Sequence, residues 1–243
     1  HRNRWSCLRH IFTIFIVSTL IGIFLIQQFL MPVLTRTVMG DAPTAMLWLL
    51  NRAYLRLVHH VQTFGVNIIP KTIHPGKLIV VCKHQSPIDP LLVQSQCRFK
   101  IRWLMAKEFM VPSLDFIWKH SQVIPVARDG HDSAALRIAL RCLRNNEVIG
   151  IFPEGGIHSP RNAIHPFVDG IGAMVAISKA KVLLVSVDGK PQKDEMMQAA
   201  FESSHSKVTF IDLIEFPENA TKNEITDALR ARLTEATGWS LVN

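Results

Sequence analysis

A histidine and an aspartate stand five residues apart in segment 83–90, of sequence KHQSPIDP. On one continuous helix His84 and Asp89 would point about 140° apart, because each residue turns the helix by about 100°. Ser86 and Pro87 supply a turn between them, since serine is a favoured helix N-cap and proline a favoured first helical residue. We predict that Asp89 faces His84 and holds one ring nitrogen, which leaves the other free to take a proton from a hydroxyl.

A purely structural interpretation of the same segment is the alternative. Ser86 and Asp89 also have the spacing of a capping box, in which Asp89 satisfies free amides at the start of a helix. His84 would then be a histidine at a strand end without a chemical task. Both interpretations stand on these residues taken alone.

Two further groups of residues follow short apolar runs. Segment 152–156, of sequence FPEGG, places glycines where the backbone approaches a ligand closely, and Glu154 beside them can accept hydrogen bonds from hydroxyls. The alternative is an ordinary turn, with Glu154 capping a neighbouring helix. Arg128 follows the apolar run 123–127 and is placed for bidentate phosphate binding, or is solvated or paired with Asp129.

The elements that must position these residues alternate between strand and helix after Gly65. The expected strands are 77–82, 101–105, 148–152, 182–187 and 207–214. The expected helices are 87–96, 133–143, 170–179 and 223–237. This alternation predicts one α/β domain over residues 65–243, with a mostly parallel sheet flanked by helices.

Residues 1–64 differ from the rest in composition, which predicts two membrane-associated helices. Segment 11–35 carries no formal charge and is roughly long enough to cross a hydrocarbon core. No small-residue cleavage site follows it, so we expect it to be retained. The second helix, expected over 44–62, places Arg52, Arg56, His59 and His60 on one face opposite apolar residues, as in an interfacial helix. A surface helix packed on a soluble core is the alternative.

The overall composition agrees with a membrane-bound protein. The 243 residues are 48% hydrophobic and 19% charged, with a net charge of +8, which excludes a disordered or collagen-like chain. Residues 1–60 hold six Arg and one Asp, so +5 of that charge lies in the first quarter. A basic, apolar protein fits an anionic membrane surface, whereas no nucleic-acid recognition pattern is present. The four cysteines have neither metal-ligand nor disulfide-framework spacing, so we expect no metal site. We also expect no cofactor.

The order His84-x4-Asp89, then Arg128, then Phe-Pro-Glu-Gly resembles the glycerolipid acyltransferase family over about residues 60–215. Pro166, Phe167 and Gly170 extend the likeness. The resemblance implies an enzyme that moves an acyl group from acyl-CoA or acyl carrier protein to a lysophospholipid hydroxyl, such as that of 1-acyl-sn-glycerol-3-phosphate. The thioester is then a co-substrate, and the hydroxyl attacks it directly. No G-x-S-x-G nucleophile motif occurs in the chain, in agreement with direct transfer.

The resemblance also implies a role for each matching residue. His84 is the general base and Asp89 orients it; Arg128 binds the acceptor phosphate, and Glu154 with Gly155 forms the acceptor-binding loop. Family members usually continue with Thr-Arg, where this chain has Gly156-Ile157. Arg161 or His158 must then substitute, or the acceptor head group differs.

The proline residues that the family usually carries in its later strand block are also missing from 181–185. A different lysolipid acceptor, or a catalytically silent membrane-anchored lipid-binding protein, are the alternatives. Activated acyl donors are found inside the cell. We therefore expect the enzyme on the cytoplasmic face of the inner membrane, with both N-terminal helices in one leaflet.

Overall fold

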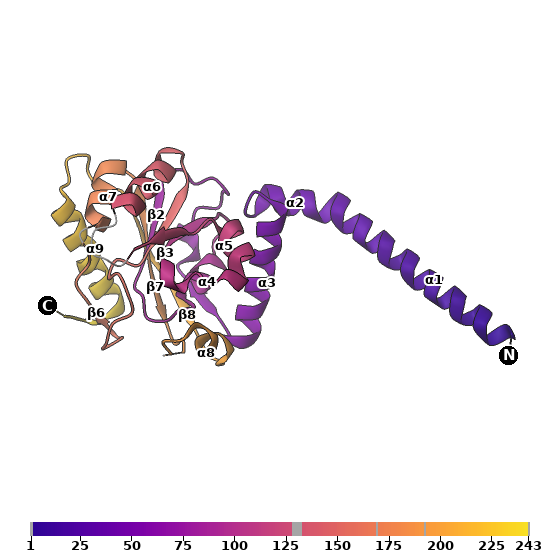
Figure 1. Cartoon of the computed structure of the whole chain (residues 1–243). Coiled ribbons are helices and arrows are strands. Elements are labelled where there is room, and N and C mark those ends of the chain that lie inside the picture. Colours follow the sequence, from indigo (N-terminus) through magenta and orange to yellow (C-terminus); the bar gives the residue numbers. More distant parts are fainter. Residues whose placement is uncertain (1, 128–132, 169, 192, 243) are drawn as a thin grey trace.

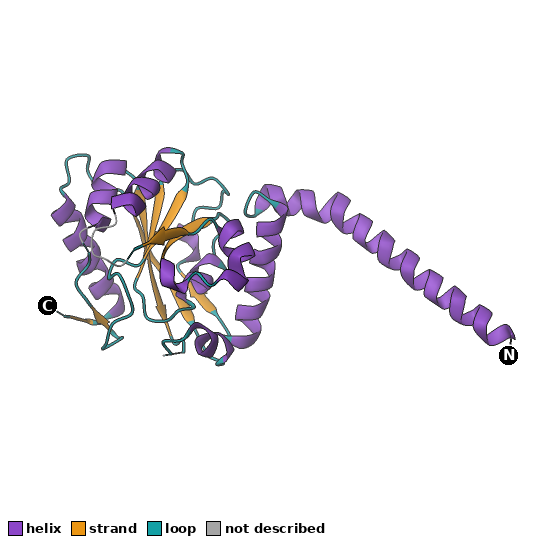
Figure 2. Cartoon of the chain, viewed as in Figure 1, coloured by secondary structure: helices purple, strands orange, loops and turns teal. Residues whose placement is uncertain are grey.

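The computed structural model describes residues 2–127, 133–168, 170–191 and 193–242, and its centre is a seven-stranded sheet (Figures 1 and 2). The strand order is β1-β8-β7-β2-β5-β3-β4. All neighbouring strands are parallel except the antiparallel pair β7 and β8. The strands are β1 (Gln62–Phe64), β2 (Leu78–Cys82), β3 (Ile101–Ala106), β4 (Ile124–Val126), β5 (Val148–Ile151), β7 (Lys181–Asp188) and β8 (Lys207–Ile214). The predicted α/β class with a mostly parallel sheet is confirmed.

Helices cover both faces of this sheet. The helices α6 (Ser133–Arg144), α7 (Gly170–Ser178) and α9 (Lys222–Thr237) share one apolar core. A second core contains residues of α3 (Ala42–Val58), α4 (Asp89–Gln94) and α8 (Met196–Phe201). In β2, Ile79 and Val81 enter the first core and Leu78, Val80 and Cys82 the second. A strand buried on both faces is apolar throughout, which explains why the sequence predicted β2.

Several short elements complete the chain. They are α5 (Asp115–Ser121), the single turns Val66–Ile68, Lys107–Phe109 and Pro112–Leu114, and the two-residue pair β6 (Ala163–Ile164) with β9 (Ser240–Leu241). No periodic signal predicts α5, α8 or this pair, because each of these elements has fewer than eight residues. The predicted helix 87–96 is shorter at both ends than expected, since α4 begins at Asp89 and ends at Gln94.

The N-terminal region begins with α1 (Arg2–Leu25), which extends away from the sheet (Figure 1). A π-helical turn (Ile26–Leu30) and α2 (Met31–Thr37) continue it, and α3 then returns along the domain. Two hydrogen bonds tie α3 to α4, from Trp48 Nε1 to the carbonyl of Gln94 and from Asn51 Nδ2 to that of Leu91. In the described part of the chain, no helix combines the length and the apolar content needed to cross a membrane.

The second predicted helix differs from the expectation in its end and its faces. It ends at Val58, and β1 follows and pairs with β8. His59, expected on the polar face, is fully buried, with Nδ1 2.8 Å from Ser204 Oγ. Leu50 and Leu57, which belong to the predicted apolar face, are exposed. The reason is that α3 packs on the domain through Trp48 and Leu55, a stripe that periodicity alone does not distinguish from its neighbours. The boundary at residue 64 stays a prediction, with β1 of the sheet on its N-terminal side.

Candidate active site

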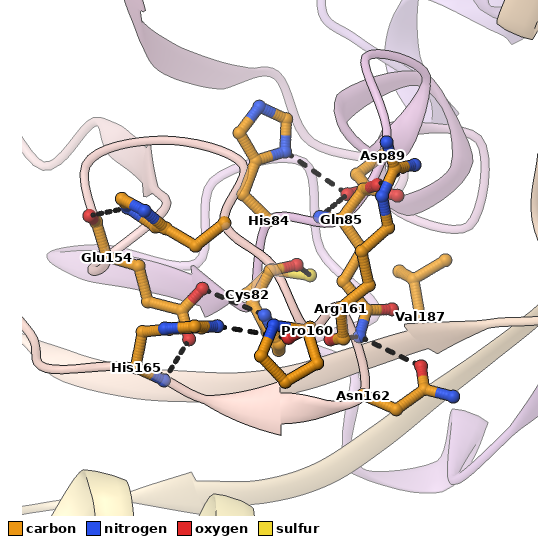
Figure 3. A network of polar contacts seen from close by, with 12 residues as sticks. Cys82, His84, Gln85, Asp89, Glu154, Pro160, Arg161, Asn162, His165 and Val187 are labelled. Atoms are coloured by element: carbon orange, nitrogen blue, oxygen red, sulfur yellow. Dashed lines mark hydrogen bonds and ion pairs between the residues drawn. The ribbon is translucent and has the colours of Figure 1, made fainter. Parts of the chain in front are cut away.

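The two motif segments meet at one edge of the sheet. β2 and β5 are parallel neighbours, with Val81 beside Ile151, so the residues after each strand emerge side by side. Residues 83–90 follow β2, and residues 152–156 follow β5. Ligands of parallel α/β sheets bind outside the carboxyl ends of the strands, where Figure 3 shows these side chains together.

His84 and Asp89 are in contact, as predicted. The distance from His84 Nδ1 to Asp89 Oδ2 is 3.1 Å (Figure 3). Asp89 Oδ2 also accepts hydrogen bonds from the amides of Gln85, at 2.7 Å, and Ser86, at 2.8 Å. Asp89 is fully buried, while 19% of the His84 side chain is exposed. A carboxylate at Nδ1 selects the tautomer with its proton on that nitrogen, which leaves the Nε2 lone pair free to accept one.

The turn between them differs in detail from the prediction. Pro87 lies in a turn ahead of α4, and the Ser86 hydroxyl caps nothing: its oxygen is buried and lacks a partner in the described structure. The amide of Asp89 instead donates to the backbone carbonyl of Ser86. Asp89 does satisfy free amides, as in the structural interpretation, but it contacts His84 with the same oxygen. One carboxylate therefore both closes the turn and orients the ring.

The His84 ring is the first member of a stack of three aromatic rings. The centroids of the His84 and Phe152 rings are 4.0 Å apart, with an angle of 20° between the ring planes. The centroids of the Phe152 and Trp103 rings are 4.9 Å apart, with an angle of 14° between the planes. Trp103 in β3 is the register partner of Gly150 in β5. A Cβ at Gly150 would lie 2.5 Å from the indole, so only glycine leaves room for this ring. The sequence carried no signal for Trp103 or Gly150, because their proximity depends on β3 pairing with β5.

Glu154 is fully buried rather than facing an open site. Its Oε2 lies 3.0 Å from Lys83 Nζ, and its Oε1 accepts a hydrogen bond from the amide of His165 at 2.9 Å. The exposed fraction of both side chains in the Lys83–Glu154 ion pair is 0%. Gly155 has a φ of +74°, which explains the glycine at this turn. The motif had not revealed that Lys83 is the partner of Glu154.

Arg161, another predicted site residue, connects segment 83–90 with the loop after β5. Its Nη1 donates to the carbonyl of Gln85 at 3.0 Å, and its Nη2 pairs with Asp194. The side chain of Gln85 donates to the carbonyl of Arg161 and accepts from Lys190 Nζ. Lys190 is largely buried, and this burial lowers its pKa, opposed by the negative charge of Asp89. Gly156 lies in the same loop, whereas Arg128 lies outside the described residues.

Cys82, directly before Lys83, does not provide a nucleophile. Complete burial, with the nearby charge of Asp89, raises the pKa of its thiol well above the ordinary value of 9.0. The thiol donates a hydrogen bond to the carbonyl of Lys83 and stays protonated at neutral pH. Among the residues that the structure describes, no group of three or more His, Cys, Asp or Glu side chains is arranged to hold a metal ion.

Comparison with known proteins identifies the chemistry. A family model described as "Acyltransferase" matches residues 57–188, more than half of the chain. The chain belongs to this acyltransferase family. It is therefore an enzyme, and its substrates are an acyl donor and an acyl acceptor. The predicted family resemblance is confirmed.

A solved structure shares the fold of this acyltransferase. It is the 1-acyl-sn-glycerophosphate (LPA) acyltransferase PlsC from Thermotoga maritima, with a TM-score of 0.66 and 18% sequence identity. The match covers 98% of this chain and 97% of that one, so it includes the N-terminal helices.

Proposed function

We propose that this acyltransferase moves a fatty acyl group from acyl-CoA or acyl carrier protein to the free hydroxyl of 1-acyl-sn-glycerol-3-phosphate, giving phosphatidic acid. The observation that carries this proposal is the His84–Asp89 contact, and Nε2 of the ring has no hydrogen-bond partner among the residues that the structure describes. The fold shared with a 1-acyl-sn-glycerophosphate acyltransferase supports the choice of acceptor.

The reaction follows from this geometry. His84 Nε2 removes the proton of the acceptor hydroxyl as its oxygen attacks the thioester carbonyl, and Asp89 stabilises the imidazolium that forms. The tetrahedral intermediate collapses with cleavage of the carbon–sulfur bond. The departing thiolate takes the proton back from His84, so the enzyme ends in its starting state. No acyl-enzyme and no bound cofactor is required.

The acceptor's phosphate needs cationic partners. We assign Arg128 to this role, with Gly155 and Gly156 forming the wall of the acceptor site. We assign the role of the family's missing arginine to Arg161 or His158. His158 Nε2 is 3.0 Å from the carbonyl of Glu154, so this ring lies beside the loop. The replacement of Thr-Arg by Gly156-Ile157 favours a second candidate, in which the acceptor is a lysolipid with another head group.

We further propose that α1 and α3 hold the enzyme in one leaflet, on the cytoplasmic face of the inner membrane. Phe12, Phe15 and Leu57 are each more than half exposed, which is unusual for large apolar residues in water. Arg52 and Arg56 are exposed on α3 and would lie near lipid phosphates. Protease treatment of sealed, right-side-out vesicles should leave the catalytic domain intact; cleavage there would refute this orientation.

The function is tested with a panel of lysolipids and acyl thioesters, read by mass spectrometry. We expect phosphatidic acid as the main product, and a decrease in turnover of about 10²–10⁴-fold for His84→Ala, which lacks the base. His74→Ala is the matched control, because His74 is exposed and outside the site. Unchanged activity of His84→Ala would refute the mechanism, and preference for another acceptor would refute the assignment of lysophosphatidate.

A further inference from the structure

Three consecutive residues of the turn that carries His84 each contact a residue of the loop after β5. Lys83 pairs with Glu154, the His84 ring stacks on Phe152, and the carbonyl of Gln85 accepts from Arg161. The turn and the loop are therefore joined at three successive positions of the turn. The first of these contacts differs from the others because both partners are charged and completely enclosed.

The carboxylate of Glu154 has no surface left for a substrate. One oxygen is held by the ammonium of Lys83. The other accepts a hydrogen bond from the amide of His165, which lies beside Glu154 in Figure 3. An acceptor hydroxyl would have to displace one of these groups to reach it. A phosphate would in addition meet a like charge, which is unfavourable at short range.

We propose that Lys83 and Glu154 are positioning residues: their buried ion pair fixes the loop of residues 152–156 against the turn that carries His84, and Glu154 acts on the reaction through Lys83 without touching the acceptor. The role in turnover rests on the function proposed above. The physical reason is that a charge buried without its partner is strongly unfavourable, so neither segment can move away while both charges remain. The stacking of Phe152 on His84 depends on this placement, since Phe152 precedes Glu154 by two residues.

The pair is tested by a double-mutant cycle with Lys83→Gln, Glu154→Gln and the combined variant. Each single variant leaves one buried charge unpaired, whereas the combined variant has two neutral side chains that can hydrogen-bond to each other. In the assay with 1-oleoyl-glycerol-3-phosphate and oleoyl-CoA, each single variant should lower kcat by about 10²-fold, as a misplaced base does. The combined variant should regain at least tenfold of this, with the KM for the acceptor close to that of the wild type throughout.

The control is the same cycle on Lys181 and Glu215, an ion pair whose side chains are more than half exposed. These substitutions should leave kcat and Tm unchanged, because exposed pairs contribute little. A raised acceptor KM in Glu154→Gln that persists in the combined variant would overturn the proposal and place Glu154 on the substrate. Additive losses in kcat and Tm would overturn it as well.

A second readout does not depend on the substrate. Diethyl pyrocarbonate modifies accessible histidines, and mass spectrometry measures the rate at His84, whose side chain is 19% exposed. The rate should rise in each single variant and return towards that of the wild type in the combined one. If the wild type fails to acylate lysophosphatidate, the proposed acceptor is wrong, but this rate and Tm still test the pair. Equal rates at His84 in all four proteins would refute the positioning role.

Discussion

Gly150→Ala tests how tightly the aromatic stack under His84 is fixed. The added Cβ would lie 2.5 and 2.6 Å from two indole carbons of Trp103 and 2.7 Å from Ile101 Cγ2. These distances are shorter than any normal contact between such atoms, so the indole must move. Trp103 is almost fully buried in the apolar core that also contains Ile101 and Val148, so the indole has little room to move.

Overpacking of this kind costs about 2 kcal/mol, which for a chain of this length lowers Tm by about 4–8 °C. The movement also reaches the site, because Trp103 stacks on Phe152 and Phe152 stacks on His84. We expect kcat to fall by about tenfold, within the range that a small misplacement of a catalytic group produces, with the acceptor KM almost unchanged.

The assay combines thermal unfolding with thiol release from oleoyl-CoA. Gly170→Ala is the control, since a Cβ there meets nothing within 4 Å and the residue lies in a helix. In a Trp103→Leu background the indole is gone, so Gly150→Ala should cost much less. If Gly150→Ala keeps the Tm and kcat of the wild type, Trp103 does not fix the stack, and the reasoning is wrong.

Two further predictions concern the pH dependence of stability. Burial raises the pKa of Cys142 from 9.0 to about 11, so the folded state keeps a proton that the unfolded state loses. The stability from this thiol is complete below pH 9 and is lost as the pH rises towards 11; Cys142→Ala should remove this part of the decline in denaturant unfolding. The pH dependence of stability has the opposite sign for Lys190. Burial lowers the pKa of Lys190 below 10.5, so the free energy of unfolding rises with pH just below that value. Lys190→Met should remove this rise. Lys190→Met should also lower Tm, because Gln85 Oε1 loses its hydrogen-bond partner. If the free energy of unfolding depends on pH in the same way in a variant and in the wild type, the pKa shift assigned to the substituted residue is wrong.

The longer strands and the motif positions were predictable because their signals are local, whereas the three-residue strands β1 and β4 were not expected. β2, β5 and β8 were expected within one residue of their observed bounds, since buried strands are short apolar runs between polar turns. The contact between His84 and Asp89 followed from the turn between them, which involves only neighbours in the chain. Helix ends were less predictable: α3 ends before His59 because the chain turns there to pair β1 with β8.

What the sequence by itself determined is the α/β class, the family resemblance and the motif residues that follow the strands. The tertiary structure alone decided which groups surround each motif residue. Glu154 stands 71 positions from Lys83, and Trp103 reaches Gly150 only because β3 lies beside β5. The physical reason is that burial and charge pairing depend on the order and register of the strands. A motif can indicate a carboxylate beside a ligand, but only the packed sheet shows whether that carboxylate faces the ligand or a lysine of its own chain.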